Sequence, residues 1–351
     1  MSQAIKSLIA SGTKLYLDSI DPDLVKLNLS WGAVGATSNP IIVAGLIESG
    51  RFDGQIGKLI DQGKDDETIA WEVTDQLVRD AQTAFHPVWA KTGGNAGWVS
   101  FELDPLIEDT ELNMPHSDRV ERYIELGRKW SAGHDNRMIK VPATPAGIEA
   151  VETLAADGLT LNVTLIFSNR QYVAARDRVC AGANRRPSLD RFKSVFSIFV
   201  SRIDQFTAKD CPHLSAAAQG QYGIVNAKRL WKANQEFWMQ HPTALSQEII
   251  FASTGTKSVK DAPWKYVAAL AGSDIQTNPP DTNKAVAASS EVFTCQVDKY
   301  PSPEILAELD AAVNVQRLEN GLMEEGLAKF ATPQKQLLAT ITSKRALLHV
   351  A

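Results

Sequence analysis

A single (β/α)8 barrel is the fold that this 351-residue sequence predicts, for three reasons. Eight short apolar runs follow one another along the chain and alternate with helical patterns. Polar residues stand near the carboxyl ends of these runs, where a parallel barrel collects its loops. Only one apolar core is indicated, so we expect one domain over residues 1–351, with the barrel from about 15 to 300 and C-terminal helices from about 301 to 351.

The strand predictions rest on branched and aromatic residues bounded by turn residues. The run Met138-Ile139-Lys140-Val141-Pro142 leads the argument, because Thr144 and Pro145 then supply an N-cap and a first-turn proline that begin a helix. In chain order the eight expected strands are Leu15–Asp18, Val34–Pro40, Trp98–Glu102, Met138–Pro142, Leu161–Phe167, Ser194–Val200, Glu248–Ser253 and Asp274–Thr277.

Apolar residues at helical spacing predict the helices that connect these strands. From Ile69 to Phe85 they recur every four residues, and we expect Pro87 to end or kink that helix. A second helix is predicted from Arg119 to Ala132, with Ser117 as its cap.

Capping residues predict further helix starts. Ser168 and Gln171 have the spacing of a capping box, which indicates a helix running to about Cys180. In the tail, Ser302-Pro303 and Thr332-Pro333 are each expected to open a helix, because serine and threonine cap helices and proline suits the first helical position.

Composition excludes several classes of partner. The net charge of -5 and the ordinary contents of apolar (44%) and charged (22%) residues indicate no surface for nucleic acid or an anionic membrane. No run of about eighteen apolar residues and no leader sequence is present, so we expect a cytoplasmic protein. Cys180, Cys211 and Cys295 are odd in number and widely spaced, which predicts reduced, buried thiols.

Lys140 is the residue from which a function can be argued, because it lies inside an apolar run near the carboxyl end of a strand. Burial disfavours the charged form of an ammonium, and an uncharged amine is a nucleophile toward carbonyl groups. The alternative is a lysine that reaches the rim of the barrel or pairs with a carboxylate. A lone strand lysine favours that alternative, so other residues must decide.

Alternation along the strands predicts that several polar residues share one face with Lys140. Two carboxylates and a lysine in one polar cup are a poor choice for stability alone, which favours an active site. For a hydroxyl such as that of Ser100, helix capping remains an equal alternative. The expected members of the cup are Asp18, Asn39, Glu102, Lys140, Asn162, Thr164 and Ser197.

Five motifs, in order and spacing, resemble those of the transaldolase family. They are Thr37-Ser38-Asn39-Pro40, Val99-Ser100-Phe101-Glu102, Ile139-Lys140-Val141-Pro142-Ala143-Thr144, Asn162-Val163-Thr164-Leu165-Ile166-Phe167-Ser168 and Phe199-Val200-Ser201-Arg202-Ile203-Asp204. The resemblance runs from about Leu15 to the segment Ala252–Lys257 and weakly beyond. It implies a barrel enzyme of the non-oxidative pentose phosphate pathway that needs no metal and no cofactor. The six scattered histidines agree with that, because they lack the clustering of a metal site.

The resemblance also implies a role for each residue of the cup. Lys140 would form a Schiff base with a ketose phosphate, and Glu102 would act as acid and base through a water held by Thr164. Asp18 would be the base for carbon–carbon cleavage. Asn39 and Asn162 would hold the hydroxyls of the dihydroxyacetone fragment, and Thr37, Ser197 and Phe199 would line the same channel.

Phosphate groups on both substrates call for cations at the outer end of the channel. Arg202 matches the family's phosphate-binding arginine, whose planar guanidinium suits that anion. Ser253 and Lys257 follow the seventh expected strand, where barrels often bind phosphate. The segment Ser253-Thr254-Gly255-Thr256-Lys257 resembles a family branch with lysine rather than a second arginine, so a surface lysine remains the alternative there.

Three functions therefore stay open from the sequence. The first is transfer of dihydroxyacetone from sedoheptulose 7-phosphate or fructose 6-phosphate to glyceraldehyde 3-phosphate or erythrose 4-phosphate. The second is a lyase like fructose 6-phosphate aldolase, although that group has shorter chains and, by resemblance, glutamine in place of Glu102. The third is an inactive sugar-phosphate-binding barrel. The expected partners are small sugar phosphates, and a homo-oligomer is allowed but not specified.

Overall fold

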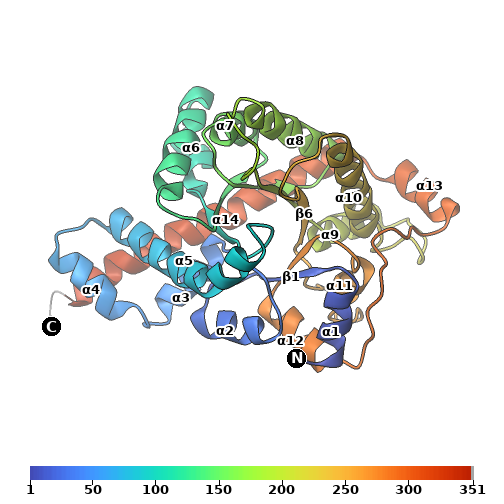
Figure 1. The fold of residues 1–351 in the computed structure, drawn as a ribbon, viewed down its shortest axis with the longest axis horizontal. Coiled ribbons are helices and arrows are strands. Elements are labelled where there is room, and N and C mark those ends of the chain that lie inside the picture. The colour runs from blue at the N-terminus through green and yellow to red at the C-terminus, as the bar shows by residue number, and fades with distance from the viewer. Residues whose placement is uncertain (349–351) are drawn as a thin grey trace.

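The structure, a computed structural model, describes residues 1–348 and is built on one sheet of parallel strands enclosed by helices (Figure 1). The strand order is β1-β7-β6-β5-β4-β3-β2. From β2 to β7 each strand lies beside the next one in the chain, and β1 lies beside β7. The strands are β1 Lys14–Leu17, β2 Val99–Glu102, β3 Arg137–Pro142, β4 Leu161–Ile166, β5 Ser194–Phe199, β6 Glu248–Ala252 and β7 Ile275–Asn278.

Seven of the eight predicted strands are confirmed, and the one expected at Val34–Pro40 is not a strand. Within it only Ala36 forms isolated bridges, to Leu17 of β1 and to Val99 of β2. Gly35 lies flat against the Tyr16 ring, where an added Cβ would be 2.2 Å from Cζ. Asn39 already caps the next helix, so little chain is left to extend a ladder. The result is a TIM-like barrel whose two edge strands are joined through Ala36.

Helices cover the outer surface of the sheet and extend beyond it. They are α1 Gln3–Ala10, α2 Pro22–Ser30, α3 Pro40–Glu48, α4 Asp53–Asp61, α5 Asp66–Lys91, η1 Pro105–Glu108, η2 Thr110–Leu112, α6 His116–Ser131, α7 Pro145–Ala156, α8 Asn169–Ala183, α9 Ser201–Asp210, α10 Tyr222–Gln240, α11 Lys265–Ala269, α12 Pro280–Ala288, α13 Pro303–Ala312 and α14 Val315–Leu348. Both predicted caps on the central units are confirmed: Thr144 Oγ1 accepts from the Gly147 N–H, and Ser168 Oγ from the Gln171 N–H.

Three helix boundaries differ from the prediction. Helix α5 continues past Pro87 to Lys91, and α14 passes through Pro333 instead of beginning there. In both helices buried aromatic packing near the proline outweighs the lost backbone hydrogen bond, as at Phe330 in α14. Ser117 is not a cap, because α6 already begins at His116 and the Ser117 hydroxyl donates to Asp118.

Other expectations from the sequence have mixed outcomes. Cys180, Cys211 and Cys295 are free thiols, but only Cys211 is buried, whereas Cys295 is exposed. Within residues 1–348, none of the helices has both the length and the apolar character that crossing a membrane requires. The last three residues of the expected C-terminal helices, 349–351, lie outside the described part of the chain.

Apolar side chains form two clusters that follow the predicted alternation of the strands. Ile139 and Val141 of β3 belong to the larger cluster, between sheet and helices. Met138, on the same strand, belongs to the smaller cluster, which joins Val195 and Ile250 of the sheet to residues of α9, α10 and α14. Since Lys140 is in phase with Met138, its side chain is directed to the inner side of the sheet.

A buried ion cluster closes the amino-terminal end of the barrel. Lys193, with no exposed side-chain surface, lies 2.5 Å from Glu248, and Lys14 lies 2.7 Å from the same carboxylate. Burial alone would raise the pKa of Glu248, but Lys193 and Lys14 hold that pKa below its ordinary value. This cluster is distinct from the polar residues at the carboxyl ends and serves the fold.

Replacing Glu248 by glutamine is expected to lower the free energy of unfolding by about 3–5 kcal/mol, because two ammonium groups lose the carboxylate that compensates them. Urea denaturation measures the change. The control is Glu236→Gln, which breaks an exposed pair with Lys232 at 3.8 Å and should cost roughly 1 kcal/mol or less. Equal losses in the two variants would show that the buried cluster has no special role.

Candidate active site

A cavity of about 180 Å³ lies at the carboxyl ends of the strands. All the predicted site residues except Glu102 and Asn162 line it, and these two lie directly behind the lining. The lining includes Asp18, Thr37, Asn39, Lys140, Thr164, Ser197, Phe199, Arg202, Ser253 and Lys257. The structure thus brings together side chains from elements spread over more than two hundred residues of the chain.

The register of three neighbouring strands builds the centre of the site. Lys140 of β3 is paired with Glu102 of β2 on one side and with Asn162 of β4 on the other, and Thr164 follows two residues further along β4. Side chains at paired positions of parallel strands point to the same face of a sheet. A slip of one residue would turn this row away from the cavity.

Lys140 makes two hydrogen bonds through its amine. Nζ donates to the Ser38 carbonyl oxygen at 3.0 Å and to Glu102 Oε2 at 3.1 Å. The side chains of Lys140 and Glu102 are each only 7% exposed. The amine is therefore shielded from solvent, held in one place and in direct contact with an acid.

Asp18 stands at the end of β1 and lines the same cavity. Thr37 Oγ1 donates to Asp18 Oδ1 at 2.7 Å. Burial raises the pKa of both Asp18 and Glu102, and it outweighs the opposite effect of Lys140 on each carboxyl. Two carboxyl groups with raised pKa values, beside one amine, form a set able to accept and return protons.

Some of the amide and hydroxyl groups of the site are hydrogen-bonded within the protein, and others have no hydrogen-bond partner in the described part of the chain. Asn162 donates to Ser100 Oγ at 3.0 Å and accepts from Ser197 Oγ at 2.7 Å, so it is held rigidly behind the cavity. Asn39 accepts from the Ile42 N–H and thus caps α3 with its carbonyl oxygen. Thr164 Oγ1 is buried and has no partner within residues 1–348. It is free to bind a water or a substrate hydroxyl.

A cationic group lies at another part of the cavity wall. The Arg202 guanidinium has ring neighbours in Phe199, at 5.0 Å from the centroid, and Phe330, at 5.8 Å. Its Nη1 is buried without a partner in the described chain. Burial lowers the pKa of Arg202, and burial followed by the charge of Arg202 lowers the pKa of Lys257. These are the features of a site that awaits an anion.

Ser253 adds strain to this end of the cavity. Its φ is +55°, in the left-handed region, directly after β6. Such a conformation is costly for a residue other than glycine and is often retained at functional sites. The Ser253 hydroxyl lies 2.9 Å from that of Ser201, beside the start of α9, which carries Arg202.

Sequence reasoning missed one lining residue of evident chemical importance. Phe330 comes from α14, far from the barrel strands in the chain, and its ring centroid lies 5.5 Å from Lys140 Nζ. A single phenylalanine in a helical tail gives no signal that it reaches an active site, because apolar residues at helical spacing predict ordinary packing.

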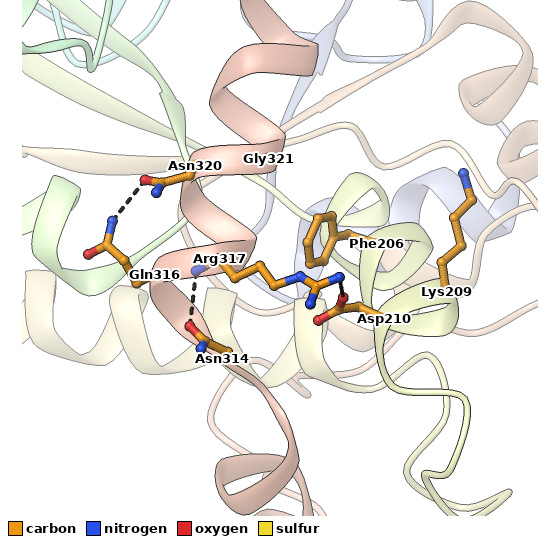
Figure 2. A pocket seen from close by; sticks show the side chains of 8 residues that line it. All are labelled: Phe206, Lys209, Asp210, Asn314, Gln316, Arg317, Asn320 and Gly321. Atoms are coloured by element: carbon orange, nitrogen blue, oxygen red, sulfur yellow. Dashed lines mark hydrogen bonds and ion pairs between the residues drawn. The ribbon is translucent and has the colours of Figure 1, made fainter.

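A larger cleft of about 690 Å³ lies elsewhere, between α9 and the first turns of α14 (Figure 2). Figure 2 shows Arg317 and Asp210 pairing across it, at 2.7 Å, while Lys209 points away. None of the predicted site residues lines this cleft. Among residues 1–348 there is also no group of three or more histidine, cysteine, aspartate or glutamate side chains placed to hold a metal.

Comparison with known proteins gives one family. Residues 15–341 match the family described as Transaldolase/Fructose-6-phosphate aldolase. The transaldolase of Thermobifida fusca is 31% identical, with 99% of each chain covered. That of Mycobacterium leprae strain Br4923 is 30% identical over 95% of this chain and 94% of its own. That of Mycobacterium marinum is 28% identical, with 95% of each chain covered.

These matches extend over nearly the whole chain, well beyond the five motifs that suggested the resemblance. The resemblance is thereby confirmed, as is the expectation of an enzyme of the transaldolase class. The chain belongs to the transaldolase/fructose-6-phosphate aldolase family.

Proposed function

We propose that this enzyme transfers a dihydroxyacetone unit from a ketose phosphate to an aldose phosphate through a Schiff base on Lys140. The donors would be sedoheptulose 7-phosphate or fructose 6-phosphate, and the acceptors glyceraldehyde 3-phosphate or erythrose 4-phosphate, in the cytoplasmic non-oxidative pentose phosphate pathway. The observation that carries the proposal is the buried Lys140 amine, 3.1 Å from Glu102, in a cavity that also contains Asp18 and Arg202. In the complete barrel, the segment around Ala36 would take the place of the eighth strand.

The first step joins Lys140 to the ketose. The unprotonated amine attacks the carbonyl carbon, and the nitrogen loses a proton while the carbonyl oxygen gains one. The resulting carbinolamine then loses its oxygen as water, which requires a second proton. Glu102 can hold and supply protons here because burial raises its pKa, and the free Thr164 hydroxyl can position the water.

The second step breaks the carbon–carbon bond. Asp18 takes the proton from the hydroxyl on the carbon beyond that bond, whose oxygen electrons then form the carbonyl of the departing aldose. The bonding electrons move into the protonated imine, which gives a neutral enamine on Lys140. An acceptor aldehyde reverses these events: the enamine carbon bonds to the aldehyde carbon, and Asp18 returns its proton to the aldehyde oxygen.

The third element is recognition of phosphate. Arg202 presents a buried, unpartnered Nη1, and Lys257 and Ser253 line the same wall. A guanidinium and an ammonium close together repel each other, so a phosphate dianion that binds both would relieve this repulsion. In this arrangement the phosphate sets the position of the sugar chain relative to Lys140.

Lys140 should become labelled when the enzyme is treated with borohydride in the presence of fructose 6-phosphate, because reduction fixes the imine to the dihydroxyacetone fragment. Peptide mass spectrometry locates the adduct. Lys140→Met should abolish it, whereas Lys257→Met, at saturating substrate, should retain it on Lys140. An adduct on another lysine in the wild-type enzyme would refute the assignment.

Glu102→Gln is expected to remove most transfer while some cleavage remains, because the amide can hydrogen-bond but cannot shuttle protons. A coupled assay with fructose 6-phosphate, with and without erythrose 4-phosphate, separates transferase, lyase and inert binder. Wild-type enzyme should turn over well only with the acceptor, and Glu102→Gln should lose roughly 10²-fold or more of that rate. Unchanged transfer in the variant would exclude Glu102 as acid and base.

The acid limb of the pH profile of kcat should lie above pH 3.8, the ordinary value for aspartate, because Asp18 must be ionised to accept a proton and burial raises its pKa. The Thr37 hydrogen bond favours the carboxylate, so Thr37→Val should move the limb further up in pH. Thr37→Ser keeps the hydroxyl and should leave the limb in place. A limb that stays put or moves down in Thr37→Val would contradict the role of Asp18.

A further inference from the structure

Helix α14 crosses the open end of the barrel. Figure 1 shows it passing diagonally from beside α10 toward α4, and it packs on α3, α4, α5, η1 and α9 along the way. With 34 residues at 1.5 Å each, it is about 51 Å long, enough to span the whole domain.

Ionic contacts fix α14 on both sides of its midpoint. On one side the buried Glu319 accepts hydrogen bonds from Ser168 and Arg170 at the start of α8. On the other side Lys335 lies 2.7 Å from Asp109, and Arg345 lies 2.6 Å from Asp66. The intervening turns are therefore held against the barrel at both ends.

Two glycines allow these turns to approach the barrel closely. A Cβ on Gly326 would lie 3.1 Å from Leu165 Cδ2, and one on Gly321 would lie 2.9 Å from the Phe206 ring. Figure 2 shows the Phe206 ring beside the turn of α14 that carries Gly321. Glycine in a helix interior costs about 1 kcal/mol relative to alanine, so close approach is the feature that explains its presence here.

Phe330 is the side chain of this part of α14 that lines the cavity. It lies one turn after Gly326, is 5% exposed and belongs to the same apolar cluster as Met138 of β3. Its ring faces Lys140 Nζ from the cavity, whereas Glu102 contacts the same amine but does not line the cavity. The lysine thus has an acid on one side and an apolar wall on the other.

We propose that Phe330 is a specificity-determining residue that keeps water away from the Lys140-bound fragment, so that the fragment reacts with an aldehyde acceptor. This inference rests on the proposed function. The enamine left after cleavage has two fates. It can form a carbon–carbon bond to an aldehyde, or its carbon can take a proton, after which water adds to the C=N carbon and dihydroxyacetone leaves as the amine is regenerated.

An apolar wall affects the two fates differently. Protonation and hydrolysis need a proton donor and water beside the fragment, whereas addition to an aldehyde needs neither at that face. The single water required for imine formation and final release can be supplied from the side of Glu102 and Thr164. Phe330 would therefore suppress the lyase route without blocking the transferase route.

The test compares free dihydroxyacetone with transferred dihydroxyacetone in Phe330→Ala and Phe330→Leu. With fructose 6-phosphate and erythrose 4-phosphate present, Phe330→Ala should raise the ratio of free to transferred product by roughly tenfold, equivalent to about 1.4 kcal/mol. Phe330→Leu keeps an apolar cover and should stay close to the wild-type ratio. After removal of substrate, the borohydride-trappable adduct on Lys140 should also decay faster in Phe330→Ala.

Leu322→Ala is the matched control, because Leu322 is a buried residue of α14 in the same apolar cluster but does not line the cavity. It should lose stability and keep the wild-type product ratio. An equal rise in both alanine variants would assign the effect to a loosened helix and overturn the inference. An unchanged ratio in Phe330→Ala with normal trapping would do the same, whereas absence of trapping in the wild-type enzyme would refute the proposed function itself.

Discussion

The contact between the Lys140 amine and Glu102 Oε2, 3.1 Å long and almost closed to solvent, is the constraint that organises this molecule. Two ionisable groups inside a barrel are costly unless each satisfies the other. Pairing in the sheet register satisfies them, because Glu102 and Lys140 occupy partner positions on β2 and β3. Every strand length and turn that fixes this register therefore also fixes the distance between nucleophile and acid.

The two ends of the barrel use buried charge in different ways. At the amino-terminal end, Glu248 lies between Lys193 and Lys14 within 2.7 Å of each, so every one of these three groups has an ionic partner. At the carboxyl end the matching is incomplete: Thr164 Oγ1 and Arg202 Nη1 are buried with no partner in the described chain. Unsatisfied polar groups lower stability, and a fold retains them where a ligand can complete them.

Local chemistry made much of the site predictable from sequence. Thr144 and Ser168 cap helices as expected, and alternation along β3 correctly separated Lys140 from Ile139 and Val141. Secondary structure predicted from short stretches of sequence was wrong where contacts with distant residues compete with local preference. The run at Val34–Pro40 has strand-like residues but is limited by the Tyr16 ring and by the cap at Asn39. Thr332-Pro333 does not open a helix as expected but lies inside α14, because packing with distant residues, invisible in a short window, outweighs the local helix-start signal.

Phe330 could not be predicted for a deeper reason. The strands supply mostly polar side chains to the cavity, with Phe199 of β5 and Ala252 of β6 as apolar exceptions, whereas the ring that faces the Lys140 amine comes from α14. This ring comes from a segment outside the strand–helix repeat, on a part of α14 that packs closely on the barrel, where a Cβ on Gly326 would lie 3.1 Å from Leu165 Cδ2. A pattern confined to the strand–helix repeat therefore gives no signal for Phe330.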